Sequence, residues 1–119
     1  MKRKYLVPLA LLTLSTSLGI ARAEAASKMY YYCETKTSDP EKWFMSGIFQ
    51  ADPYDSARIA VEFTKFVRGR YGSTTEHAIG PADCYFRQSM MDVDNNRELQ
   101  NRAATSNGNA VVDTGWAPQ

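Results

Sequence analysis

The chain alternates between short stretches rich in aromatic and branched residues and polar stretches that hold turn residues. Residues 29–35, 43–50, 82–88 and 110–116 have the aromatic and β-branched side chains that pleated sheets favour. The segment 36–41 contains Ser, Asp and Pro, which end strands and form turns. The pattern therefore predicts four strands, of which the first two form a hairpin.

Two helices are predicted between these strands. Asp52 can cap the first turn of a helix in which Pro53 takes the first position, and Gly72 can end it. Apolar side chains recur along this helix at helical spacing on one stripe, which must face a core. The stripe consists of Ile59, Ala60, Phe63, Phe66, Val67 and Tyr71. Residues 92–106 predict a second, weakly amphipathic helix.

The start of the chain has the three parts of a secretory signal peptide. These are a basic start at residues 2–4, an apolar stretch over residues 5–20, and small residues at Ala21 and Ala23. The apolar stretch is shorter than the roughly 20 residues that a membrane-spanning helix needs, which favours cleavage over an uncleaved anchor. We expect residues 1–23 to be removed and residues 24–119 to form a single small domain, periplasmic or secreted, with no membrane span after cleavage.

Charge argues against nucleic acid as a partner. The full chain has a formal net charge of +1 at pH 7. Loss of residues 1–23 removes four basic residues and no acidic one, which leaves ten basic against thirteen acidic residues and a charge of −3. A mildly acidic domain lacks the long-range attraction to phosphate backbones on which non-specific nucleic-acid binding depends.

The two cysteines, Cys33 and Cys84, predict one disulfide, because an even cysteine count is typical of small exported domains. Closing a loop of about 52 residues would stabilise the fold by about 4 kcal/mol in the chain-entropy model. The alternative is two separate buried thiols. If the bridge joins neighbouring strands, the first strand lies between the second and the third.

The element order ββαβαβ is typical of an α+β sandwich of two layers. A helix between the second and third strands makes these two parallel within one sheet, and the hairpin makes the first antiparallel to the second. We therefore expect a four-stranded mixed sheet in the order 2-1-3-4, with both helices on one face.

A Cys33–Cys84 bridge would divide the neighbouring side chains between two sheet faces, because side chains alternate along a strand. Tyr31 and Phe86 would share the cysteine face, under the helices. The other face would carry Tyr30, Tyr32, Tyr85 and Arg87. We interpret these four residues as a candidate binding face for an envelope or extracellular protein or a glycan, since each has an apolar body and a polar tip. The alternative is that the tyrosines only fill a half-exposed sheet face.

No catalytic, cofactor or metal site is predicted. Asp92 begins a stretch that resembles a calcium loop, but Arg97 stands where glycine is needed and Ala103 where glutamate is needed. His77 is the single histidine, and with both cysteines in a bridge a zinc ligand set is not reached. No G-x-S-x-G or S-x-x-K motif occurs in residues 24–119, so an enzyme is not expected.

The motifs at residues 31–33, 45–49, 63–72 and 111–116, together with Cys84, resemble small exported bacterial proteins of unassigned function. The resemblance implies an envelope location and no site residue. Our first hypothesis is a non-catalytic binding or accessory domain that uses the tyrosine face. The second is an inhibitor or immunity protein against a cell-wall or toxin enzyme, in which the loop 73–81 plugs an active site. The third is a small hydrolase built around His77.

Overall fold

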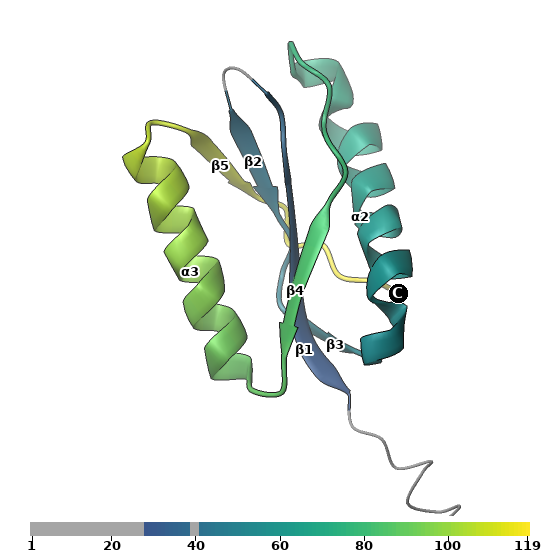
Figure 1. Cartoon of the computed structure of the whole chain (residues 1–119). Coiled ribbons are helices and arrows are strands. Elements are labelled where there is room, and N and C mark those ends of the chain that lie inside the picture. The colour runs from purple at the N-terminus through teal and green to yellow at the C-terminus, as the bar shows by residue number, and fades with distance from the viewer. Residues whose placement is uncertain (1–27, 39–40) are drawn as a thin grey trace, which may run out of the picture.

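The computed structural model describes residues 28–38 and 41–119 of the chain (Figure 1). The predicted signal peptide at residues 1–23 lies outside the described residues. The strands are β1 (Met29–Lys36), β2 (Lys42–Met45), β3 (Phe49–Ala51), β4 (Asp83–Arg87) and β5 (Ala110–Asp113). The α-helices are α2 (Ser56–Tyr71) and α3 (Met90–Ser106), and short 3-10 turns precede and follow α2 at Pro53–Asp55 and Gly72–Thr74.

The long strand β1 holds the sheet together through both of its edges. One edge pairs with β4 in antiparallel fashion, and the other pairs antiparallel with β3 near its start and with β2 near its end. β5 is added to β2 in parallel. The α+β class, the mixed sheet and the position of the first strand between the second and third are confirmed, with β2 and β3 together in the place of the single strand predicted over residues 43–50.

The predicted position of the last strand is wrong. β5 lies beside β2 and not beside β4, so the order across the sheet is β4, β1, β2, β5. The physical reason is the path of α3, which contacts β4, β1 and β5 and so crosses the sheet before β5 begins. The chain therefore leaves α3 at the free edge of β2.

Ser46 divides the predicted second strand into β2 and β3. Its hydroxyl oxygen accepts a hydrogen bond from the Cys33 backbone N–H at 2.8 Å, and its own N–H donates to the Cys33 carbonyl at 2.9 Å. The Gly47 N–H then donates to the Trp116 carbonyl at 2.9 Å. A Cβ atom at Gly47 would lie 3.4 Å from that same carbonyl oxygen, so the glycine allows the C-terminal segment to pass close by.

The main core lies between the sheet and α2. Fully buried side chains come from both layers: Tyr31, Cys33 and Phe44 from the sheet, and Ile59, Phe63 and Val67 from α2. Phe66, Tyr71 and Trp116 pack against this cluster. The Trp116 ring lies 5.2 Å from that of Phe63 and 5.9 Å from that of Phe49, measured between centroids. The stripe predicted on α2 is therefore its core-facing side.

The second helix does not share that face. α3 lies on the opposite side of the sheet from α2 (Figure 1), where Tyr32 points because it alternates with Tyr31. Tyr32 is fully buried, and its hydroxyl accepts a hydrogen bond from Asn96 Nδ2 of α3 at 2.8 Å. The expectation of both helices on one face is thus corrected to a helix–sheet–helix arrangement. The reason is that Tyr32 is a large side chain on this face, and α3, which contacts β1 there, covers it and binds its hydroxyl.

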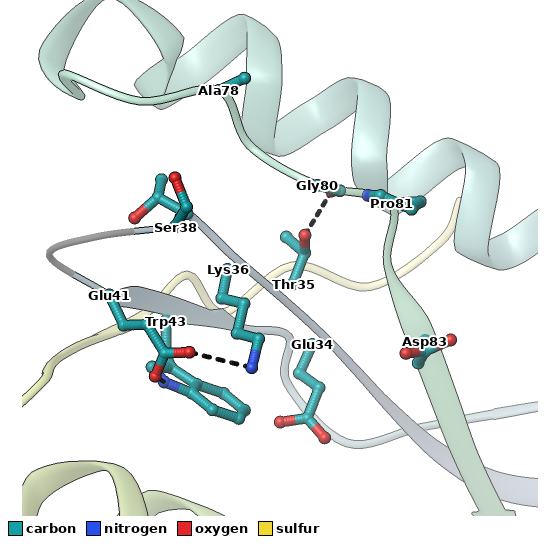
Figure 2. Close-up of a pocket in the computed structure, with 11 residues that line it drawn as sticks. Glu34, Thr35, Lys36, Ser38, Glu41, Trp43, Ala78, Gly80, Pro81 and Asp83 are labelled. Carbon is teal, nitrogen blue, oxygen red and sulfur yellow. Dashed lines mark hydrogen bonds and ion pairs between the residues drawn. The ribbon is translucent and has the colours of Figure 1, made fainter. Parts of the chain in front are cut away.

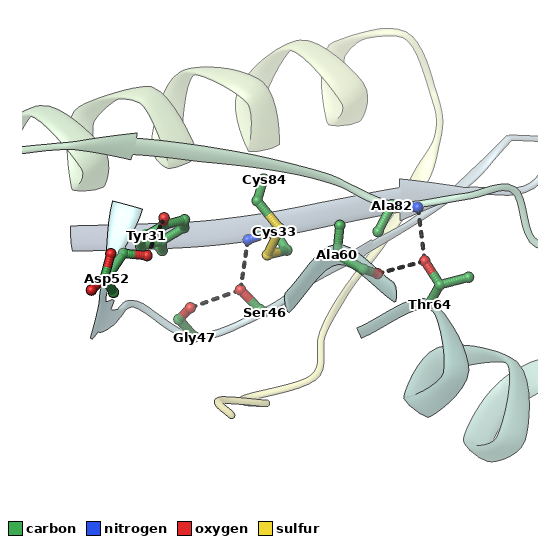
Figure 3. The surroundings of a disulfide bond; sticks show 9 residues. All are labelled: Tyr31, Cys33, Ser46, Gly47, Asp52, Ala60, Thr64, Ala82 and Cys84. Atoms are coloured by element: carbon green, nitrogen blue, oxygen red, sulfur yellow. Dashed lines mark hydrogen bonds between the residues drawn. A yellow bond between two sulfur atoms is a disulfide. The ribbon is translucent and has the colours of Figure 1, made fainter. Parts of the chain in front are cut away.

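The Cys33–Cys84 disulfide is present, and the two cysteines lie directly opposite each other in the β1–β4 pair. Figure 3 shows the polar contacts that secure its surroundings. The Thr64 hydroxyl donates to the Ala60 carbonyl at 2.8 Å and accepts from the Ala82 N–H at 2.9 Å. α2 is therefore attached to the chain just before β4, next to the covalent link.

Removal of the disulfide should lower stability without changing the fold. We expect the Cys33→Ala/Cys84→Ala variant to lose up to about 4 kcal/mol in its free energy of unfolding, because the unfolded chain gains loop entropy. Urea denaturation of residues 24–119, followed by circular dichroism, measures this loss. The wild type with reductant should match the variant, and the variant should not respond to reductant. A wild type that reductant leaves unchanged would contradict the prediction.

Candidate functional site

The four residues of the predicted binding face do lie on one sheet face, but α3 covers part of it. Tyr30 lies opposite Arg87 and Tyr32 opposite Tyr85 in the β1–β4 pair. Tyr32 has no exposed surface, whereas Tyr30 and Tyr85 are half-buried and Arg87 is exposed. The Arg87 guanidinium lies 4.2 Å from the centre of the Tyr85 ring. Tyr32 is therefore a core residue, and Tyr85 and Arg87 remain within reach of a partner.

Tyr85 and Arg87 line a hollow of about 290 Å³ between β4 and α3. From α3 it is bordered by Asp92, Asn95, Asn96 and Leu99. The Leu99 side chain is 58% exposed, so this hollow has an apolar rim beside its polar groups.

A larger cavity, of about 540 Å³, opens on the same sheet face beyond α3 (Figure 2). The alternation that places Tyr32 on this face also places Glu34 and Lys36 there. Trp43 lies opposite Lys36 in the β1–β2 pair, and Asp83 lies opposite Glu34 in the β1–β4 pair. The cavity is thus an extension of the predicted face past the end of its tyrosines.

The loop before β4 forms one wall of this cavity through Ala78, Gly80 and Pro81. The Gly80 N–H donates to the Lys36 carbonyl at 3.0 Å, and the Gly80 carbonyl accepts from the Thr35 hydroxyl. The Arg68 side chain of α2 donates to the Ile79 carbonyl at 3.0 Å. The wall is therefore fastened to both β1 and α2.

The carboxylate of Glu41 is fully engaged inside the cavity. Lys36 Nζ lies 3.0 Å from Glu41 Oε1, while Glu41 Oε2 accepts hydrogen bonds from Trp43 Nε1 at 3.3 Å and Asn109 Nδ2 at 3.0 Å. The hydrogen bond from Lys36, followed by that from Trp43, lowers the pKa of Glu41. The Lys36 ammonium also lies 4.9 Å from the centre of the Trp43 ring. Glu41 and Lys36 thus neutralise each other.

Glu34, unlike Glu41, has a carboxylate oxygen without a partner in the described part of the chain. Its Oε2 atom is buried and has no hydrogen-bond partner within residues 28–38 and 41–119. Burial raises the pKa of Glu34, and the negative charge of Asp83 raises it further, against smaller opposite effects from the Tyr32 hydroxyl and Lys36. Burial also raises the pKa of Tyr32 well above its ordinary value, so this hydroxyl stays neutral and can donate to Glu34. The Tyr32 hydroxyl thus accepts from Asn96 of α3 and also affects the pKa of Glu34, its neighbour on the same face of β1.

His77 lies exposed on the loop before β4, on another hollow of about 370 Å³ that Glu76 and Lys42 also line. The hydrolase hypothesis built on it stays a prediction. Asp92 lies in the first turn of α3, where its N–H donates to the Ser89 side chain at 3.4 Å. Among the described residues, no group of three or more His, Cys, Asp or Glu side chains could hold a metal ion. In the same part of the chain, no helix has the length and apolar character to cross a membrane.

Comparison with known proteins adds no relative: no family model matches the chain, and neither the curated proteins nor the solved structures contain a match. The candidate site therefore depends on the geometry alone.

Sequence reasoning missed the cavity, although part of its pattern was present. Glu34 and Lys36 follow Tyr32 at the same two-residue spacing, and Asp83 precedes Tyr85 by two residues. Extending the tyrosine face by two steps along the first strand and by one step along the third would have included these three charged residues. The position of Trp43 depends on the pairing of β1 with β2, which spacing alone does not define.

The buried carboxyl of Glu34 should make stability depend on pH. Because the pKa of Glu34 in the folded state is raised above its ordinary value of about 4.5, the folded protein holds this proton over a pH range in which the unfolded chain has lost it. This contribution to stability is complete below about pH 4.5 and is lost as the pH rises through the raised pKa.

We expect Glu34→Gln to flatten that slope. At pH 7 the variant should be more stable than the wild type by up to about 1 kcal/mol, the scale of a cross-strand charge pair, because the amide carries no charge opposite Asp83. Urea denaturation between pH 4 and 8 measures the slope, and Glu98→Gln, at an exposed site on α3, is the control. Parallel slopes for Glu34→Gln and the wild type would contradict the prediction.

Proposed function

We propose that the protein is a non-catalytic binding domain that acts after export, in the periplasm or outside the cell, and that its ligand occupies the cavity beside Trp43. One observation carries this proposal. The cavity of about 540 Å³ is lined by a carboxylate, Glu34, with a buried oxygen that no described side chain satisfies. Native proteins rarely leave such an atom unpaired, so a ligand donor is its natural partner.

The composition of the cavity agrees with a binding role. Ligand pockets combine apolar or aromatic walls with a few placed polar groups. Here Trp43 and Pro81 supply apolar wall, while Glu34 and Asp83 supply acceptors. Glu41 has three partners of its own, so it holds the Trp43 ring in place and is not available to react with a substrate.

Two features support the compartment. Disulfides persist in oxidising surroundings. Here the fully buried Cys33 is bonded to Cys84, which packs against the same core. The basic, apolar and small residues of positions 1–23 have the order of a cleavable export signal.

A second candidate function, an inhibitor or immunity protein, is favoured by the edge of the molecule at β4. Tyrosine and arginine concentrate binding energy at protein interfaces, and Tyr85 and Arg87 lie there beside the exposed Leu99. The loop 73–81 is a weaker candidate for contact with an enzyme, because its end at Ile79 and Gly80 is fastened to the rest of the fold.

Nuclear magnetic resonance can test the proposed site. The oxidised form of residues 24–119 would be titrated with a defined panel of cell-wall saccharides, short peptides and small amines. We expect at least one member to shift the indole N–H of Trp43 and the backbone N–H groups of Glu34 and Gly80, because these groups line the cavity.

Two variants decide between the surfaces. Trp43→Ala should weaken binding by about tenfold or more, the scale of a lost aromatic contact, and Tyr85→Ala should leave it unchanged. If no panel member shifts the Trp43 indole signal, the proposal fails. Binding that depends on Tyr85 and not on Trp43 would favour the second candidate.

A further inference from the structure

Two carboxylates in the cavity lack a counterion. Glu34 and Asp83 are direct partners in the β1–β4 pair, an arrangement in which like charges destabilise a sheet. Among the described residues, no ion pair joins either of them to a basic side chain. The cation that lines the cavity, Lys36, is bound to Glu41. The cavity therefore has an excess of negative charge next to an unpaired, buried acceptor.

The protein already shows how this cavity holds a cation. The Lys36 ammonium lies 3.0 Å from a carboxylate oxygen of Glu41 and 4.9 Å from the centre of the Trp43 ring. A carboxylate together with the face of a tryptophan is a favourable environment for an ammonium or a guanidinium group. Glu34 and Asp83 offer carboxylates of the same kind on the side of the cavity away from Glu41 (Figure 2).

We propose that the cavity recognises the ammonium or guanidinium group of an organic cation, held between Glu34 and Asp83. The proposal rests on the binding function assigned to the same cavity and names the class of ligand. An organic cation fits better than a metal ion, because no three potential metal ligands come together within the described residues.

Binding of a cation should release a proton. Glu34 must be ionised to pair with the ligand, so its protonated form gives up one proton as the ion pair forms. Burial and the charge of Asp83 on β4 favour the protonated form of Glu34 in the empty cavity. Lys36 and the Tyr32 hydroxyl favour the ionised form, and this hydroxyl also accepts a hydrogen bond from Asn96 of α3. Affinity should therefore fall as the pH is lowered through the raised pKa of Glu34.

Calorimetry with matched probes tests the ligand class. The oxidised form of residues 24–119 would be titrated with Nα-acetyl-arginine amide, Nα-acetyl-lysine amide and agmatine. Nα-acetyl-citrulline amide, which is neutral and nearly the same shape as the arginine probe, is the control. We expect at least one cation to bind tenfold or more tightly than the citrulline compound. The arginine and lysine probes distinguish guanidinium from ammonium, and agmatine distinguishes a free cation from one carried on a peptide.

Three variants and a proton count separate recognition from a structural effect. Glu34→Gln and Asp83→Asn should each weaken cation binding by about tenfold or more, the scale of a lost charged hydrogen bond, and Glu98→Gln should not. Titration in buffers of different ionisation enthalpy should show proton release by the wild type and none by Glu34→Gln. Far-ultraviolet circular dichroism confirms that each variant is folded.

The outcomes distinguish this proposal from the one on which it rests. If the cations bind no better than the citrulline compound, or Glu34→Gln binds them as well as the wild type does, the cation proposal is overturned. If a saccharide or neutral peptide then binds in a Trp43-dependent manner, the binding function stands without it. If no probe affects Trp43, both proposals fall.

Discussion

The covalent link between β1 and β4 is the constraint on which the arrangement of the other side chains depends. Cys33 faces α2, so Tyr32 and Glu34 on either side of it must face the other way. A slip of one residue in the pairing would exchange the two faces of β1, and the disulfide excludes it. The core under α2, the contact with α3 and the carboxylate in the cavity are three results of this one register.

Much of the fold follows from local patterns, and the main error shows where those patterns stop. The apolar stripe of α2 and the position of Cys33 and Cys84 were sufficient to predict that helix, the α+β class and the central place of the first strand. α3 attaches differently: only Val93 and Ala104 of this helix are fully or almost fully buried, and Asn96 and Arg97 hold it to the sheet through hydrogen bonds. Polar contacts of this kind leave no apolar stripe at helical spacing in the sequence. The sequence therefore indicates a helix here without indicating which face of the sheet the helix covers.

The candidate site, too, could be predicted only in part from local sequence patterns. A tyrosine has an apolar body and a polar tip, so it suits a wet sheet face and a buried one equally well, and the Asn96 amide decides the case for Tyr32. The division of these side chains between the two sheet faces was therefore predicted, but not which part of the outer face α3 covers. The cavity itself requires the pairing of Lys36 with Trp43 and the attachment of Gly80 to the Lys36 carbonyl. Both contacts join segments that are distant in the chain or depend on register, and neither has a local sequence pattern.

The place of Trp116 in the core has a consequence for the order in which the protein folds. This residue packs against Phe63 and Phe66 of α2. It follows β5, whose pairing with β2 joins residues 68 positions apart. Contacts of such long range form late, because they require the closure of a large loop. A chain emerging amino terminus first thus carries α2 with part of its apolar side uncovered until β5 pairs with β2 and brings Trp116 onto that side. During that interval the uncovered side of α2 is the apolar surface most open to other molecules.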